Sequence, residues 1–189
     1  QYRMPVPYGS QRTPTAQWTA TAAGCVVLAA QGEGPRITAV TCGKIVDKGI
    51  TDANNMGAAM APAAYDTLSA HFAATGTGPQ DYDLVVTGDL GVLGHRIVMD
   101  LFAQDGVDMG KNYQDCGMLL YDIQAQDMHA GASGCGCAAS VLCGYLLGQM
   151  EANHLRKLLF APTGALLSPT SSFQGESIPS ICHAVVIEK

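Results

Sequence analysis

Residues 127–137 hold the densest group of side chains that could do chemistry: Asp127, His129, Cys135 and Cys137. His129 could act as a general base or donate to a carboxylate, because an unperturbed histidine titrates near pH ~6.5; it could equally be a hydrogen-bonded structural residue. The two cysteines could be thiolates activated by the start of a helix, but the apolar sequence behind them favours packing as small hydrophobic side chains. The spacing of the four residues differs from that of structural zinc ligands, so no metal is predicted.

Three glycine-containing turns, at residues 88–91, 129–134 and 163–170, each follow a segment with a strand pattern. If these strands are parallel, the turns share one rim of the sheet, where open α/β sheets bind ligands. The first two turns also precede predicted helices, whose unpaired N–H groups favour an anion. Asp89 could orient a partner or, more simply, cap its helix. Arg96 is the obvious fixed cation of the rim, unless it is an ordinary solvated charge.

The segments that would position these turns alternate between strand and helix patterns. Strands are predicted at 18–29, 37–46, 82–87, 116–121, 155–161 and 181–187, and helices at 56–74, 92–104 and 134–151. From Ile37 onward the order βαβαβαββ predicts an α/β fold with a mixed, mostly parallel five-stranded sheet and helices on both faces. The last strand follows its neighbour without a helix between them, so we expect it to be antiparallel.

Composition narrows the class of protein. The 189 residues are 48% apolar, enough for one sizeable core, and the net charge of −6 with ten Lys and Arg argues against nucleic acid as a partner. Seven cysteines, mostly in apolar runs, fit a reducing cytosol. No apolar run reaches the ~18 residues of a transmembrane helix, and no nucleotide-binding fingerprint is present, so we expect a soluble chain without a cofactor. The absence of an initiator Met predicts a fragment of a longer protein.

Six longer motifs are specific enough to compare with known families. They are PTAQWT (14–19), NNMGAAMAPAA (54–64), DLVVTGDLG (83–91), DMHAGASGCGC (127–137), GALLSPT (164–170) and QGESIP (174–179). Together they closely resemble the stage V sporulation protein AD family along essentially the whole chain. The resemblance implies a thiolase-like fold and a bacterial endospore protein that binds dipicolinic acid and supports its uptake into the forespore. It also implies that complete members have two similar halves, so that residues 1–35 are a remnant of the first half and residues 36–189 are the second.

The sequence departs from catalytic relatives of that fold in two places. Thiolases have Gly-His-Pro shortly before a Gly-Ala-Ser-Gly motif. This chain has Gly-Ala-Ser-Gly at 131–134, but His129 lies one residue nearer to it than the thiolase histidine does, and no Pro follows His129. Ketosynthases of the third type have His-Gln-Ala-Asn where this chain has Gly-Asp-Leu-Gly at 88–91. The resemblance therefore implies a thiolase scaffold used to bind a small carboxylate, with no clearly preserved base for acyl transfer.

These observations predict a ligand-binding site on the shared rim, with donors from backbone N–H groups, a hydroxyl, a histidine and an arginine. The predicted ligand-binding residues are Asp89, Gly91, Arg96, His129, Ser133, Gly134, Cys135 and Gly164. One alternative is an acyltransferase of the thiolase or ketosynthase type, with His129 or His183 as base and Cys135 or Cys137 as its partner. Another is a scaffold that docks proteins through its apolar faces.

Expected partners are other proteins of the same sporulation transport system and, for the full-length protein, a second copy. The expected location is the cytoplasm or the surface of the spore inner membrane.

Overall fold

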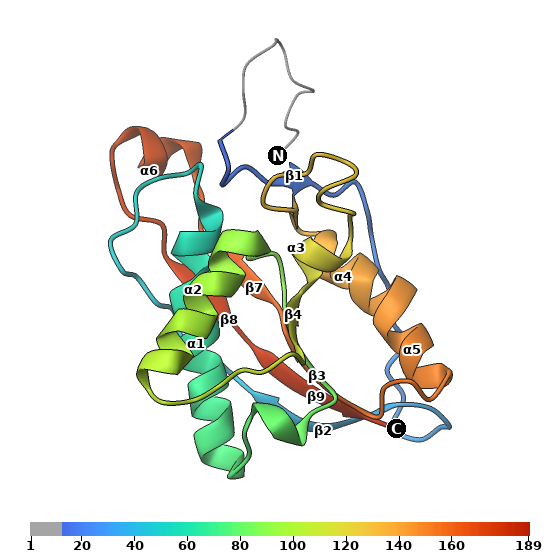
Figure 1. The fold of residues 1–189 in the computed structure, drawn as a ribbon. Helices are drawn as coiled ribbons and strands as arrows, with labels where there is room; N and C mark the ends of the chain where they lie inside the picture. The colour runs from blue at the N-terminus through green and yellow to red at the C-terminus, as the bar shows by residue number, and fades with distance from the viewer. Residues whose placement is uncertain (1–12) are drawn as a thin grey trace.

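The computed structural model describes residues 13–189 and confirms the α/β class (Figure 1). The main sheet has five strands in the order β2 (Arg36–Thr41), β9 (Ala184–Glu188), β6 (Lys157–Ala161), β3 (Leu84–Thr87) and β4 (Tyr113–Asp115). Strand β3 pairs in parallel with both β4 and β6, whereas β9 runs antiparallel to β6 and to β2. The sheet is therefore mixed and mostly parallel, and its last strand is antiparallel as predicted.

Helices cover both faces of this sheet, also as predicted (Figure 1). On one face lie α1 (Met56–Thr75) and α2 (Gly91–Gln104); on the other, α4 (Cys137–Val141) continues through a π-helical turn (Leu142–Leu146) into α5 (Leu147–Glu151). Successive strand residues point to opposite faces. Val85 accordingly packs in the core with α1 and α2, and Val86 in the core with α4 and α5. No helix within residues 13–189 is long and apolar enough to cross a membrane.

Short elements above the sheet bring distant segments together. Strand β1 (Trp18–Thr19) pairs in parallel with β5 (Ala132–Ser133), and β7 (Thr163–Ala165) pairs antiparallel with β8 (Ser180–Cys182). The remaining short elements are a 3₁₀ turn (Pro79–Asp81), α3 (Cys116–Leu119) and α6 (Pro169–Phe173). Strands β1, β5 and β7 all lie beyond the carboxyl ends of β3 and β6, where the predicted rim should be.

Five predicted elements are wrong in their bounds. The strand predicted at 37–46 ends at Thr41, and the strand predicted at 181–187 is divided into β8 and β9 at His183. The strand predicted at 18–29 is only Trp18–Thr19, because the chain beyond it lies against α4 so closely that a Cβ on Gly24 would overlap the Ala139 carbonyl group. The strand predicted at 116–121 is helix α3, and the strand itself lies just before it, at Tyr113–Asp115. The helix predicted from residue 134 begins at Cys137.

Candidate functional site

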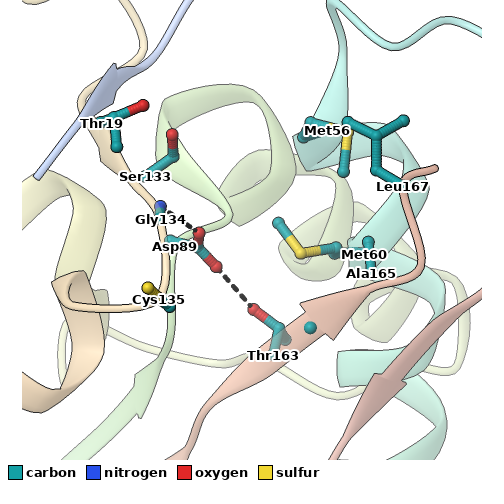
Figure 2. A pocket seen from close by; sticks show the side chains of 11 residues that line it. Thr19, Met56, Met60, Asp89, Ser133, Gly134, Cys135, Thr163, Ala165 and Leu167 are labelled. Carbon is teal, nitrogen blue, oxygen red and sulfur yellow. Dashed lines mark hydrogen bonds between the residues drawn. The ribbon is translucent and has the colours of Figure 1, made fainter. Parts of the chain in front are cut away.

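The three glycine-containing turns meet on one rim, as the strand directions predicted. Asp89, two residues after β3, is their meeting point, because its carboxyl group accepts hydrogen bonds from the Gly134 N–H at 2.9 Å and the Thr163 hydroxyl at 3.3 Å (Figure 2). The buried amide of Gln17 adds a link by donating to the carbonyl oxygens of Asp89 and Ala132, each at 2.8 Å. Asp89 therefore connects turns that lie 45 and 74 residues away in the sequence.

A second carboxyl group, that of the fully buried Asp115, holds the turn after β3 from beneath. One of its oxygens accepts from the N–H groups of Gly91 and Gly117, both at 2.9 Å. The other accepts from the Leu90 N–H at 3.0 Å and from the Thr87 hydroxyl at 2.8 Å. Asp115 thus supplies the acceptor for the first N–H groups of α2 and of α3.

Because Asp115 does this, the helix-capping role predicted for Asp89 is wrong. Sequence reasoning missed Asp115 because the strand predicted at 116–121 left it outside any element. One signal in the sequence could have identified it. Asp115 stands directly before the short apolar run that begins at Cys116, and an Asp in that position is typical of a helix N-cap. Burial raises the pKa of Asp115 to about 7, although its hydrogen bonds lower it.

The predicted anion donors at Gly91 and Gly134 are already used inside the protein. The Gly91 N–H donates to Asp115 and the Gly134 N–H donates to Asp89. Gly134 also lies before the first turn of α4, which begins at Cys137. The prediction that these N–H groups are free for a ligand is therefore wrong, because carboxyl groups of the protein accept from both.

A pocket of about 420 Å³ lies beside Asp89, between the start of α1, the β5–α4 connection and β7 (Figure 2). It is lined by Thr19, Met56, Met60, Asp89, Ser133, Gly134, Cys135, Thr163, Gly164, Ala165 and Leu167. Its polar side chains are one carboxylic acid and three hydroxyls, and no Lys, Arg or His among residues 13–189 belongs to the lining. Burial raises the pKa of Asp89, while the hydrogen bonds from Gly134 and Thr163 lower it.

The structure brings five of the eight predicted ligand-binding residues together. Those that line the pocket are Asp89, Ser133, Gly134, Cys135 and Gly164. Those outside its lining are Gly91, Arg96 and His129. Gly91 lies beneath the rim with a φ of 65°, and Arg96 is exposed on α2. The pocket therefore forms where predicted, but without the predicted cation.

Neither candidate histidine reaches the pocket. His129 Nδ1 lies 3.1 Å from the Thr13 carbonyl oxygen and its Nε2 lies 3.6 Å from the Asp127 carboxylate. His183 is exposed between β8 and β9, and its Nδ1 accepts from the Gly43 N–H at 3.1 Å. Both side chains are engaged with loops outside the pocket lining.

The two cysteines after the rim differ from each other. Cys137 is fully buried at the first position of α4, and burial raises its pKa to about 12, which confirms packing as its role and opposes an activated thiolate. Cys135 is exposed at the pocket, so the packing role predicted for it is wrong. Within the described residues, no three His, Cys, Asp or Glu side chains are grouped so as to hold a metal ion.

Comparison with known proteins gives consistent matches over the full chain. A family model described as Stage V sporulation protein AD matches residues 1–188. The curated Stage V sporulation protein AD of Bacillus subtilis (strain 168) is 44% identical over 189 residues, which make up 100% of this chain and 56% of that protein. The chain thus spans little more than half the length of this relative.

Solved structures give weaker matches. A 3-oxoacyl-(acyl-carrier-protein) synthase III is similar with a TM-score of 0.39 and 14% identity, covering 83% of this chain and 50% of its own. The 3-oxoacyl-[acyl-carrier-protein] synthase III from Aquifex aeolicus VF5 has a TM-score of 0.34 and 11% identity, covering 84% of this chain and 54% of its own.

Proposed function

The chain belongs to the stage V sporulation protein AD family, and we propose that it binds dipicolinic acid beside Asp89 and supports uptake of this ligand into the forespore without catalysis. The observation that carries the proposal is the pocket on the rim, where one carboxyl and three hydroxyl groups face apolar side chains. Its volume of about 420 Å³ falls within the usual range of small-molecule sites. Dipicolinic acid, a flat ring with two carboxyl groups, offers matching polar edges and apolar faces.

Hydroxyl groups and a proton on Asp89 would hold the carboxylates of the ligand. Thr19 and Ser133 each carry a hydroxyl that can donate to a carboxylate oxygen, whereas the Thr163 hydroxyl donates to Asp89. An ionised Asp89 would repel the ligand, but its pKa is raised by burial, and a second carboxylate beside it raises that pKa further. Asp89 then donates its O–H to the ligand, and binding takes up a proton.

The candidate nucleophiles and bases support binding over acyl transfer. The Cys137 thiol, whose pKa is raised to about 12, stays protonated at neutral pH and is a poor nucleophile. His129 and His183 each bond to backbone groups of neighbouring loops. Cys135 remains the thiol at the pocket, so the enzymatic alternative is tested directly at that residue.

Calorimetric titration with dipicolinate between pH 5.5 and 8.5 tests the function. We expect the affinity of the native chain to fall as pH rises, because an ionised Asp89 repels the ligand. In Asp89→Asn the amide can accept from Gly134 N–H and donate to Thr163, so the affinity should be nearly independent of pH and several-fold higher than the native value at pH 8.5. Asp100→Asn, which removes an exposed charge on α2, is the matched control and should behave like the native chain.

Absence of binding at every pH would refute the proposal. Formation of a stable acyl group on Cys135 during incubation with acyl-coenzyme A would favour the acyltransferase alternative, and no interaction with either compound would favour a scaffold.

We also propose that the full-length protein acts as a homodimer with other proteins of the same sporulation transport system, in the cytoplasm or at the spore inner membrane. The support is membership of the family together with the location that the sequence resemblance implies. Cross-linking in sporulating cells followed by fractionation would test both statements.

A further inference from the structure

The short helix α6 has an apolar side chain in solvent and a hydroxyl in the interior. Phe173, its last residue, is 91% exposed. The hydroxyl oxygen of Ser172, the residue before it, is shielded from solvent and has no hydrogen-bond partner within residues 13–189. An exposed large apolar side chain and a buried unpaired polar atom are the departures from ordinary burial that call for an explanation. Here they occupy adjacent positions of one helix.

Residues 167–176, which we call the α6 loop, hydrogen-bond only among themselves in the part of the chain that the structure describes. The Ser172 N–H donates to the Ser168 carbonyl oxygen at 3.0 Å, and the Glu176 N–H donates to that of Ser171 at 3.0 Å. The Ser171 hydroxyl also donates to the Ser168 carbonyl oxygen, at 3.1 Å. The loop is therefore a self-contained unit, and compact surface loops of this kind are frequently functional.

The base of the α6 loop is fixed on both sides. On one side the Leu166 N–H donates to the Pro179 carbonyl oxygen at 2.9 Å, which extends the pairing of β7 with β8. On the other side Ile178 is 2% exposed, and its N–H donates to the Ile50 carbonyl oxygen at 2.8 Å. A self-contained loop on a fixed base can turn as one body, because no hydrogen bond among the described residues has to break. A few residues at its ends can absorb the change in φ and ψ.

This base lies at the mouth of the pocket beside Asp89. Leu167, the first residue of the α6 loop, lines the pocket next to Met56 (Figure 2). Phe173 lies outside the lining. Figure 1 shows α6 beside the start of α1, at the same end of the molecule as β1. A turn of the loop towards β1 and β5 would therefore carry Phe173 across the mouth of the pocket.

We propose that the α6 loop is a lid, which turns about its base to place Phe173 over the mouth of the pocket and to bring the Ser172 hydroxyl into solvent. One movement covers the exposed ring and gives the unpaired hydroxyl a water molecule as partner. The arrangement described above is the open form. A closed lid excludes water from the polar side chains of the pocket, which strengthens their hydrogen bonds to a bound molecule.

The lid goes beyond the proposed function, because it controls entry to and exit from the pocket whatever the ligand is. Its control comes from Phe173, which touches the mouth only in the closed form, rather than from the residues that line the pocket. The lid can therefore be tested both without a ligand and with dipicolinate.

Cross-linking of the full chain without a ligand tests the closure itself. Cys135 is exposed on the wall of the pocket opposite Leu167 (Figure 2). In Phe173→Cys a closed lid brings a second thiol within reach of it, and a short bismaleimide joins the two as each thiol S–H adds across one C=C bond. Cysteine is itself a small apolar side chain, so it keeps part of the tendency to close. Gln174→Cys places the thiol at the next, also exposed, position and is the matched control.

We expect Phe173→Cys to cross-link to Cys135 several-fold faster than Gln174→Cys does, after each rate is divided by the rate with a maleimide that has one reactive group. Mass spectrometry of the digested product identifies the joined peptides. Adding Cys135→Ser to Phe173→Cys should abolish this product. Equal rates for the two positions, or no product that contains Cys135, would refute the lid.

The rate at which dipicolinate leaves the pocket tests the effect of the lid on a ligand. Phe173→Ala should raise the dissociation rate by about tenfold, the lower end of what burial of a phenylalanine side chain contributes, and change the association rate less. Phe173→Leu should retain most of the slow dissociation, because it keeps an apolar cover. Leu166→Ala removes an exposed apolar side chain from the fixed base and should change neither rate.

The outcomes separate the lid from the proposed function. If Phe173→Cys cross-links as expected and dipicolinate does not bind, the lid stands and the proposed function fails. If dipicolinate binds but leaves Phe173→Ala at the native rate, the lid is refuted and the proposed function is unaffected.

Discussion

Replacing Asp115 by alanine tests whether this buried carboxyl group organises the rim. In the native structure it accepts from the N–H groups of Leu90, Gly91 and Gly117 and from the Thr87 hydroxyl, at distances of 2.8–3.0 Å. Alanine leaves the N–H groups of Leu90 and Gly91 without their acceptor, whereas the Gly117 N–H keeps the Gly88 carbonyl oxygen at 3.1 Å and the Thr87 hydroxyl keeps the Gln114 carbonyl oxygen at 3.3 Å. Because the site is fully buried, water reaches these donors only if the structure opens.

The expected loss of stability follows from the number of donors left unpaired. A buried donor without a partner costs roughly 1–3 kcal/mol. The lower end of that range, applied to the backbone N–H groups of Leu90 and Gly91, gives about 2 kcal/mol of unfolding free energy. For a chain of this size the melting temperature should fall by about 4–8 °C.

Urea unfolding at pH 6 measures this loss with a matched control. Asp115→Asn has a side chain of the same size and keeps one oxygen acceptor, so it is the matched control for Asp115→Ala. We expect Asp115→Ala to be about 1 kcal/mol or more less stable than Asp115→Asn, because asparagine keeps one oxygen acceptor for these N–H groups. If the two variants agree within about 0.5 kcal/mol, the N–H groups do not depend on this side chain and the account of the rim is wrong.

Three further predictions follow from pKa shifts, backbone geometry and burial. Burial raises the pKa of Asp115 from the ordinary 3.8 to about 7 in the folded chain. The free energy of unfolding should therefore fall as pH rises from about 4 to 7 and then level off. Urea titrations should show a flatter pH dependence for Asp115→Asn. Gly91→Ala should lower the free energy of unfolding by about 3 kcal/mol in thermal melts, because a Cβ there would overlap a backbone carbonyl oxygen. Gly76→Ala, which has a similar φ but lies in open space, should lower it by about 1 kcal/mol. A thiol reagent should modify Cys135 rapidly in the folded chain and Cys137 only in urea, and equal rates would contradict the burial of Cys137.

The common rim could be predicted because it depends on strand direction. Alternating strand and helix patterns imply parallel strands, and parallel strands place the turns that follow them at one edge. The convergence of Asp89 and Thr163, which follow the parallel strands β3 and β6, follows from that argument, whereas the strand predicted before Gly134 is helix α3. The pairing of their atoms could not be predicted, because a hydrogen bond across 45 residues depends on packing that no local pattern specifies.

The glycines around residue 134 illustrate the same limit. In the sequence they predict a flexible turn that opens a helix. In the structure, Gly136 lies against the backbone of Ala22, and Gly24 lies against that of Ala139, so neither position has room for a side chain. These glycines permit close backbone packing between residues 22–24 and residues 136–139, and α4 begins at Cys137, directly after Gly136. A sequence window reveals the glycine but not the neighbour that requires it.

The two rim carboxyl groups have different capacities to respond to a ligand. Asp115 is fully buried and its oxygens already accept four hydrogen bonds, so it has little capacity left for another partner. Asp89 accepts from Gly134 and Thr163 and lines the pocket, so its oxygens still have lone pairs available there. In the proposed binding, a proton taken up at Asp89 would act on both loops bonded to it, whereas Asp115 keeps the turn beneath them in place. The carboxyl group that faces the pocket is therefore separate from the one that holds the turn after β3.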